Sequence, residues 1–433
     1  MSAGISAMAM TILFGVFSGL LLLGTPVAFC LGIASVATVL YLDLPPMVVF
    51  QQINSNMNAF AMLAIPFFIF AGDLMMRGGI ADRLIGMAAA MFGHLRGGLG
   101  QVNVVASFLF GGVSGSAVAD ASAIGGIMIP QMAKHGYARD YAVNVTVNAA
   151  IIALLVPPSH NMIIYSLAAG GTISIADLFT AGILPGVLLA VALMITAYVV
   201  ARRRGYPSGI FPGWYGVLKA VVVAAPGIIL IAIIFGGVRS GVFTATESSC
   251  IAVIYSLLVT LLVYRELDWP SFVHATLGAV RTTAMVLLVI GTAGAFGWLM
   301  AFLQVPAATI ELMQSISSNK YVILLLINIL LLVLGTFMDM APMIIICTPI
   351  FLPLIKAFGI DPVQFGIILI LNAGIGLNTP PVGSVLFVGC AVGKISIGEA
   401  MKTIWPFFGA SVVVLLLVSY VPAVTLWLPS LFR

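Results

Sequence analysis

The chain has 433 residues and a formal net charge of +4; 62% of its residues are hydrophobic and 7% are charged. Its mean hydropathy of +1.22 excludes a soluble globular protein, which at this length must present far more polar surface to water. The composition instead indicates an all-α polytopic protein that crosses a membrane many times. The four cysteines lie far apart in apolar runs, so the sequence predicts neither a disulfide framework nor a cysteine metal site.

Apolar runs long enough to span a bilayer recur along the chain. The first run is too long for a cleaved signal peptide, and we expect it to remain as a span. Membrane-spanning helices are expected near residues 9–31, 56–76, 141–165, 181–201, 219–238, 248–264, 282–303, 363–390 and 407–430. Threaded in turn from a cytoplasmic N-terminus, these spans place most lysines and arginines on the inner side, as is usual for membrane proteins. Only Arg239, Lys320, Lys356 and Arg433 fall on the outer side.

Two further apolar stretches are interrupted by small and polar residues and are not expected to cross the membrane. Residues 97–133 contain GGVSGSAVADASAIGG, and the basic residues at both ends fall on the inner side if this stretch folds back on itself. Residues 321–355 contain LGTFMDMAP and have both ends on the outer side. Lipid does not satisfy freed backbone groups, so irregular backbone at this depth must be buried in protein or line a wet cavity. We therefore expect two opposed re-entrant helical hairpins, one opening inward and one outward, with tips that face a site.

The two halves of the chain repeat one layout at an offset of about 223 residues. Pro157-Pro158 and Pro380-Pro381 interrupt spans at matching positions, where proline removes backbone donors and unwinds a helix. Inverted repeats with unwound helices place substrate and ion sites near the bilayer midplane. The expected organisation is a first inverted repeat over 1–204 (scaffold span, arm, hairpin 97–133, broken helix 141–165), a linker and scaffold spans over 205–264, and a second repeat over 265–433 (arm, hairpin 321–355, broken helix 363–390, last span).

Polar residues at membrane depth are the functional candidates, because a carboxylate there costs about 2.5 kcal/mol or more. Asp120 follows the first hairpin tip and Asp339 lies in the second. Their oxygens suit a small alkali cation, together with those of Ser114, Ser116, Thr336 and Thr379. We expect His160 to be a satisfied polar residue or a substrate donor, with a proton relay as the alternative. Residues that either line a cavity or join helices are Ser159, Asn161, Asn148, Asn372 and Asn378.

Several motifs together resemble one family. GGVSGSAVADASAIGGIMIP, VPPSHNMIIY, GTFMDMAPM and NAGIGLNTPPVGSVLFVGCAVGKISI are similar to the large membrane subunit of TRAP transporters, the tripartite ATP-independent periplasmic carriers. The resemblance covers essentially the whole chain. It implies a sodium-coupled importer of a small organic anion, such as a C4-dicarboxylate, a sialic or other sugar acid, or a sulfonate. It also implies an elevator motion in the bacterial inner membrane, a small membrane subunit of about four spans on a separate chain, and a periplasmic binding protein.

The resemblance also implies roles for individual residues. One sodium site would use Ser114, Gly115, Ser116 and Asp120 with the unwound backbone at Val156 and Pro157. The other would use Gly335, Thr336, Asp339, Asn378 and Thr379. Substrate would lie between the two sodium sites, near Ser159, His160 and Asn161, with Asn148 and Asn372 as further polar candidates.

Other functions are compatible with parts of the sequence. A proton-coupled carrier of the same fold is the main alternative. A membrane enzyme using Asp120, Asp339 and His160 would leave the inverted repeat unexplained, and a passive channel does not require two opposed hairpins with carboxylates. The chain has no glycine-rich loop of the GxxxxGKS or GxxxxGKT type, so ATP-driven transport is not expected.

Overall fold

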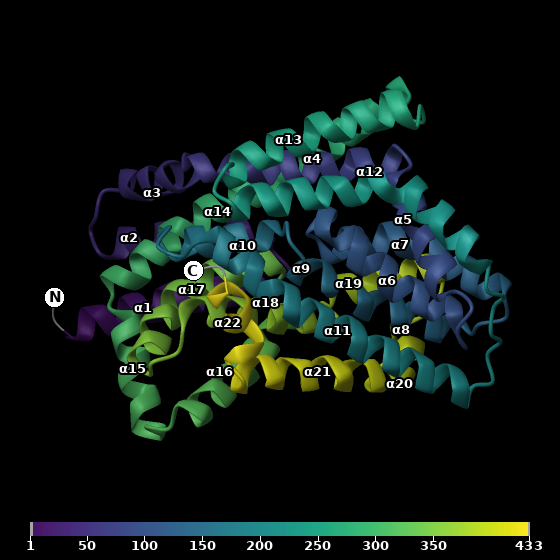
Figure 1. Ribbon diagram of the computed structural model, residues 1–433. Helices are drawn as coiled ribbons and strands as arrows, with labels where there is room; N and C mark the ends of the chain where they lie inside the picture. The colour runs from purple at the N-terminus through teal and green to yellow at the C-terminus, as the bar shows by residue number, and fades with distance from the viewer. Residues whose placement is uncertain (1–2, 432–433) are drawn as a thin grey trace.

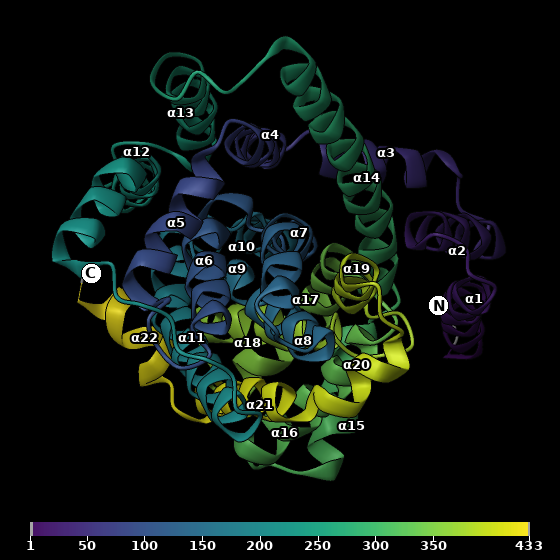
Figure 2. The ribbon, with the colours of Figure 1, turned by 90° about the vertical axis from the view of Figure 1, so that its right-hand side faces the viewer.

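A computed structural model describes residues 3–431, and these residues form α-helices joined by short connections (Figure 1). Seven of the described helices are long and apolar enough to cross a membrane, and there are up to ten spans if each bent helix pair forms one. The first helical hairpin, the inner helix of a second hairpin and two interrupted helices occupy the centre of the molecule, and an arc of further helices surrounds one side of it (Figure 2).

The first hairpin consists of α6 (Gly98–Ser114) and α7 (Ala117–Lys134). Gly115 has φ of +58°, a left-handed conformation that glycine adopts without strain and that ends α6. Ser116 then begins α7, because its hydroxyl accepts a hydrogen bond from the backbone nitrogen of Ala119 at 3.3 Å. The turn therefore needs only two residues, and α6 and α7 pack side by side, as the sequence predicts for residues 97–133.

The second hairpin consists of α16 (Lys320–Gly335) and α17 (Met340–Ala357), with Asp339 in extended conformation just before α17. In Figure 1 the first hairpin extends inward from the right-hand side and the second from the left-hand side, so their tips approach the middle from opposite directions. This opposed arrangement is the one predicted from the inverted repeat.

Both predicted interruptions occur at the proline pairs. In the first half, α8 (Arg139–Ala149) and α9 (Ile152–Leu155) are followed by a break and by α10 (His160–Ala168), with a bend of 52°. In the second half, α18 (Pro362–Gly376) is separated from α19 (Ser384–Gly393) by a break that contains Pro380-Pro381. Both Pro-Pro bonds are cis. α8, α9 and α18 are buried on almost every side. α9 and most of α18 are accordingly apolar, whereas α8 also buries the polar side chains of Asn144, Thr146 and Asn148.

An arc of helices covers one side of this centre (Figure 2). It contains α4 (Ala64–Arg77), α12 (Gly213–Arg239), α13 (Ala245–Leu258, continued as a π-helix over Val259–Val263) and α14 (Trp269–Phe302). α3 (Met47–Met57) packs on α14, a short 3₁₀ turn (Phe60–Leu63) leads into α4, and α5 (Ile80–Phe92) joins the arc to the first hairpin by packing against α12 and α6.

The other side of the centre is covered by helices from the ends of the two repeats. α11 (Ile175–Arg203) packs against α21 (Trp405–Tyr420) and α22 (Ala423–Ser430). α15 (Val305–Ile316) lies against α17, and α20 (Ile397–Thr403) lies against α8. The fold class predicted from the sequence, an all-α polytopic protein with inverted repeats, opposed hairpins and two unwound helices, is confirmed. The division of the chain at residues 204 and 264 stays a prediction.

Two predicted spans are wrong in detail. The segment 9–31 is two helices, α1 (Ala3–Leu22) and α2 (Val27–Tyr41), which pack side by side (Figure 2). Gly24, with φ of +79°, and Pro26 end the first helix and reverse the chain. The segment 407–430 is bent by 59° between α21 and α22. Arg433, which the predicted threading places on the outer side, lies outside the described residues.

Candidate transport site

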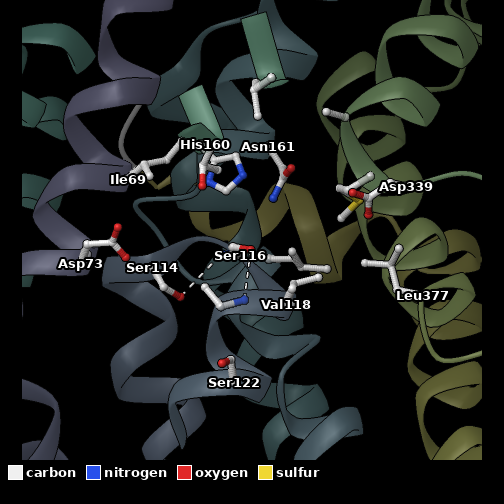
Figure 3. A pocket seen from close by; sticks show the side chains of 18 of the residues that line it. Ile69, Asp73, Ser114, Ser116, Val118, Ser122, His160, Asn161, Asp339 and Leu377 are labelled. Atoms are coloured by element: carbon white, nitrogen blue, oxygen red, sulfur yellow. Dashed lines mark hydrogen bonds between the residues drawn. The ribbon is translucent and has the colours of Figure 1, made fainter. Parts of the chain in front are cut away.

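A cavity of about 510 Å³ lies where the hairpin tips meet the arc of helices (Figure 3). α4 and α14 form one wall, through residues such as Ile69 and Met285. The starts of α7, α10 and α17 form the other walls. The polar side chains that line the cavity are Asp73, Ser114, Ser116, Ser122, His160, Asn161, Thr282 and Asp339.

Three helix N-termini converge on this cavity. They are represented in its lining by Ala117 and Val118 of α7, by His160 and Asn161 of α10, and by Met340 and Ala341 of α17. Unpaired backbone N–H groups and the helix dipole make each N-terminus partially positive, which favours anions. No lysine or arginine occurs among the described residues that line the cavity. The helix N-termini are therefore the source of positive potential within its walls.

The first hairpin tip is attached to the first helix break. The Asn161 side chain donates a hydrogen bond from Nδ2 to the carbonyl oxygen of Gly115 at 2.9 Å. One turn earlier on α6, a Cβ atom at Gly112 would lie 2.9 Å from the carbonyl oxygen of Pro157, so the two backbones are in close contact. Gly115 itself lies against Pro158 and His160. The tip at Ser114, Gly115 and Ser116 is thus one turn from the contact with Val156 and Pro157, and the structure brings these members of the first predicted sodium site into one region.

Asp120 lies behind the tip and does not line the cavity. It is in the first turn of α7 and is fully buried. Its carboxylate faces the hydroxyl of Ser107 on α6, yet neither group makes a hydrogen bond of good geometry. Buried acceptor oxygens without partners are rare in folded proteins and suit an oxygen-coordinated cation or a proton.

The second hairpin tip is attached to the second break in the same manner. The backbone nitrogen of Val382 donates to the carbonyl oxygen of Thr336 at 3.0 Å. The Ser384 hydroxyl donates to Oδ1 of Asp339 at 3.4 Å. The last residues of α16 and α18 meet face to face, since a Cβ atom at Gly335 would lie 3.1 Å from the Cα of Gly376.

The remaining members of the second predicted sodium site lie within the second break itself. Asn378 is buried and donates from Nδ2 to the carbonyl oxygen of Val147 at 2.8 Å, whereas its Oδ1 has no hydrogen-bond partner. The Thr379 hydroxyl donates to the carbonyl oxygen of Ile375 at 3.1 Å. The hydrogen bond between Val382 and Thr336 joins the second hairpin tip to the second helix break. The tip residues Gly335, Thr336 and Asp339 therefore lie in the same region as Asn378 and Thr379.

The predicted substrate residues separate into two groups. His160 and Asn161 line the cavity, and Ser159 is fully buried beside them with its hydroxyl unpartnered. Asn148 and Asn372 do not line the cavity. Asn148 donates to the carbonyl oxygen of Asn144 at 2.9 Å within its own helix, and Asn372 donates to Oδ1 of Asn328 on α16 at 2.9 Å.

Asp73 is a cavity residue that the sequence analysis did not select. It lies on α4, inside the predicted span 56–76, and its carboxylate is directed toward Ser114 and Ser116 in Figure 3. Its Oδ2 atom is close to α14, where a Cβ atom at Gly278 would lie 2.9 Å away. Asp73 could have been identified by the same criterion as Asp120 and Asp339, because it is also a carboxylate within an apolar segment.

Comparison with known proteins assigns this arrangement to a family. Residues 14–424 match the family model described as the DctM component of the tripartite ATP-independent periplasmic transporter. The chain belongs to the DctM family of TRAP transporter subunits. It is a transporter subunit and not an enzyme, and the resemblance noted in the sequence is confirmed.

Curated relatives match this chain along nearly its whole length. YgiK of Salmonella typhimurium, whose function is uncharacterized, is 46% identical over 97% of this chain and 97% of its own length. The sialic acid TRAP transporter large permease protein of Vibrio cholerae is 38% identical over 96% of this chain and 97% of its own. The YdaH transporter of Alcanivorax borkumensis has the same fold, with a TM-score of 0.58 over 88% of each chain and 15% identity.

Proposed function

We propose that this DctM-family chain carries a small organic anion into the bacterial cell through sodium-coupled secondary transport. The observation that carries the proposal is the cavity of about 510 Å³, on which the N-termini of α7, α10 and α17 converge. This volume matches a small metabolite, and three helix N-termini favour a carboxylate or sulfonate. The related large permease of Vibrio cholerae is named for sialic acid, a sugar acid. The substrate would be a C4-dicarboxylate, a sugar acid or a sulfonate.

Two sodium sites would flank this cavity, one at each junction of tip and break. The first would use Ser114, Gly115 and Ser116 with the carbonyls of Val156 and Pro157, supported by Asp120 behind the tip. The second would use Gly335, Thr336, Asp339, Asn378 and Thr379. Support comes from the buried oxygens of Asp120, Ser159 and Asn378, which have no hydrogen-bond partner, because hard cations bind oxygen ligands and unwound backbone supplies carbonyls.

An elevator motion would carry the site across the membrane. Each tip is joined to its break by hydrogen bonds, so hairpins and broken helices can move as one body. The cavity lies between this body and α4 and α14 of the arc, which would stay fixed as the scaffold. Alternating access in inverted-repeat transporters commonly moves one bundle against another around an intact site.

The chain would act together with two partners. A small membrane subunit of about four spans, on a separate chain, would cover scaffold helices in the segments 9–31 and 219–264, and a periplasmic binding protein would deliver the solute. Scaffold side chains such as Phe29, Val222 and Leu262 are exposed and apolar, as required of surfaces that contact lipid or another membrane helix. The bacterial inner membrane is the expected location.

Uptake by the three-component system in proteoliposomes tests this function. At fixed pH, an inward sodium gradient should drive uptake of the solute that the cognate binding protein carries. Asp339→Asn should weaken the sodium dependence by about tenfold or more, because a charged ligand is replaced by a neutral one. Glu311→Gln, at an exposed position of α15, is the matched control and should transport normally. Uptake that follows a proton gradient and ignores sodium would support a proton-coupled carrier of the same fold.

A further inference from the structure

We propose that Asp73 makes the cavity selective for an organic monoanion whose opposite end donates hydrogen bonds through hydroxyl or ammonium groups, and disfavours dicarboxylates. The inference rests on the proposed function, since it assigns one cavity to substrate, and it narrows the substrate class. It follows from the unequal chemistry of the cavity walls.

One wall favours an anion and the other favours a donor. In Figure 3, Ser116, His160 and Asn161 lie at the helix N-termini, and Asp73 faces them from α4. Asn161 uses its Nδ2 for the Gly115 carbonyl. Apart from the N–H of Ala119, which donates to Ser116, the first backbone N–H groups of these helices have no partner within the helix and would hold a carboxylate or sulfonate beside His160. A substrate held there extends toward α4 and reaches the Asp73 carboxylate, which accepts hydrogen bonds and donates none when ionised.

The charge of Asp73 has no cationic partner in the cavity wall. Arg77 lies one turn farther along α4, but its side chain is exposed and does not line the cavity. None of the ion pairs within 4 Å among the described residues includes Asp73. The second carboxylate of the cavity, Asp339, accepts a hydrogen bond from Ser384 and belongs to the proposed second sodium site. The Arg77 charge acts on Asp73 only from outside the cavity, so Asp73 remains the negative group on the scaffold side with no cation in direct contact.

The position of Asp73 is fixed by the helix beside it. α14 approaches α4 at Gly278, where any Cβ atom would meet Oδ2 of Asp73 at 2.9 Å. The half-buried carboxylate is thus held against α14 on one side and faces the cavity on the other. A second substrate carboxylate at this place would meet a like charge in a partly desolvated site, which is unfavourable, whereas a hydroxyl or ammonium group would gain a charge-assisted hydrogen bond.

Protection of an introduced cysteine against maleimide tests this selectivity without the binding protein. The full-length chain carries Ser122→Cys in the cavity lining and Cys250→Ala, which removes the one cysteine that is not buried among the described residues. It is reconstituted with its small subunit in proteoliposomes containing saturating sodium. The probes are two pairs of equal chain length that differ at one end, gluconate with glucarate and 4-hydroxybutyrate with succinate. In each pair the monoanion should protect at a concentration at least about tenfold lower than the dianion. Asp73→Asn should reduce this ratio to within about threefold, chiefly by improving protection by the dianion.

A matched control and a separate readout make the outcomes distinct. Asp82→Asn, at an exposed carboxylate of α5 that does not line the cavity, should keep the original ratio. Three outcomes would overturn the inference. They are equal or better protection by the dianions in the parent, an unchanged ratio of protecting concentrations in Asp73→Asn, and protection by none of the four probes. Sodium-driven uptake is measured separately, with the complete three-component system. Uptake that does not depend on sodium would contradict the proposed coupling but not the selectivity, and equal protection by monoanions and dianions would contradict the selectivity but not the coupling.

Discussion

The contact between Gly335 and Gly376 gives the sharpest prediction about the architecture. A Cβ atom on Gly376 would lie 2.6 Å from the Cα atom of Gly335 and 2.7 Å from its carbonyl carbon. Both are backbone atoms, so no side chain rotation relieves the overlap. Carbon atoms pack at about 3.5–4.0 Å, and α16 and α18 would have to separate by about 1 Å to admit a methyl group.

We therefore expect Gly376→Ala to destabilise the protein by about 1–3 kcal/mol, the usual range for overpacking a close contact. Thermal unfolding of the purified complex with the small subunit measures this change. At an unfolding entropy of about 2.1 cal/mol/K per residue, a chain of 433 residues loses about 1 °C of melting temperature per kcal/mol, so a fall of about 1–3 °C is expected. Because the overlap is at the second tip, sodium-driven uptake should fall as well.

Gly126→Ala is the control for the substitution itself. Gly126 lies inside α7 with no atom within 4 Å of the position of an added Cβ, so alanine there should stabilise the protein by about 0.5–1 kcal/mol through helix propensity. A melting temperature that stays level or rises in Gly376→Ala would refute the close approach of the second tip to its break.

Two further predictions concern single interactions. Asn161→Ala removes the donor to the Gly115 carbonyl and should lower the stability by about 1–3 kcal/mol. It should also speed amide hydrogen exchange at residues 114–116, which mass spectrometry measures. Unchanged exchange would contradict the attachment of the first tip to the first break through Asn161. The Arg83 guanidinium lies 2.7 Å from the Glu266 carboxylate and lowers the pKa of that carboxyl. The pair therefore stabilises the protein fully above the pKa of glutamate in the unfolded chain, about 4.3. This stabilisation is lost as the pH falls through the lower pKa of Glu266 in the folded protein. Since the Glu266 side chain is 45% exposed, Glu266→Gln should lower the stability by less than about 1 kcal/mol at neutral pH. In acid, the melting temperatures of this variant and of the parent should converge. A difference that grows in acid would contradict a stabilising ion pair between Arg83 and Glu266.

The central elements of the fold could be predicted because their causes are local. Gly115 and Ser116 end one helix and begin the next through their own backbone and side-chain chemistry. Each proline pair removes two backbone donors, so each interrupts its helix whatever surrounds it. Basic residues at both ends of each hairpin segment fall on the same side of the membrane, which indicates that the segment turns back. Because the second half of the chain repeats the layout of the first with inverted topology, the two hairpins are expected to open to opposite sides.

Other features depend on information that hydropathy does not contain. The segment 9–31 is apolar throughout, and the reversal at Gly24 and Pro26 is lost when hydropathy is averaged over a long window. For polar residues at membrane depth, sequence gives the depth but leaves open the direction in which the side chain points. Asn148 and Asn372 turn toward neighbouring backbone and side chains, whereas Asp73 turns toward the cavity, and packing of whole helices decides the difference.

The most direct test of the central claim is the sidedness of the hairpin ends in intact cells. In a Cys250→Ala background, single cysteines at Arg96 and His135 mark the two ends of the first hairpin, and those at Ser318 and Ala357 mark the ends of the second. A membrane-impermeant maleimide added outside should label both ends of the second hairpin and neither end of the first, with the reverse pattern in inside-out vesicles. Labelling of the two ends of either hairpin from opposite sides would mean that the segment crosses the bilayer, which contradicts two opposed tips meeting around one cavity.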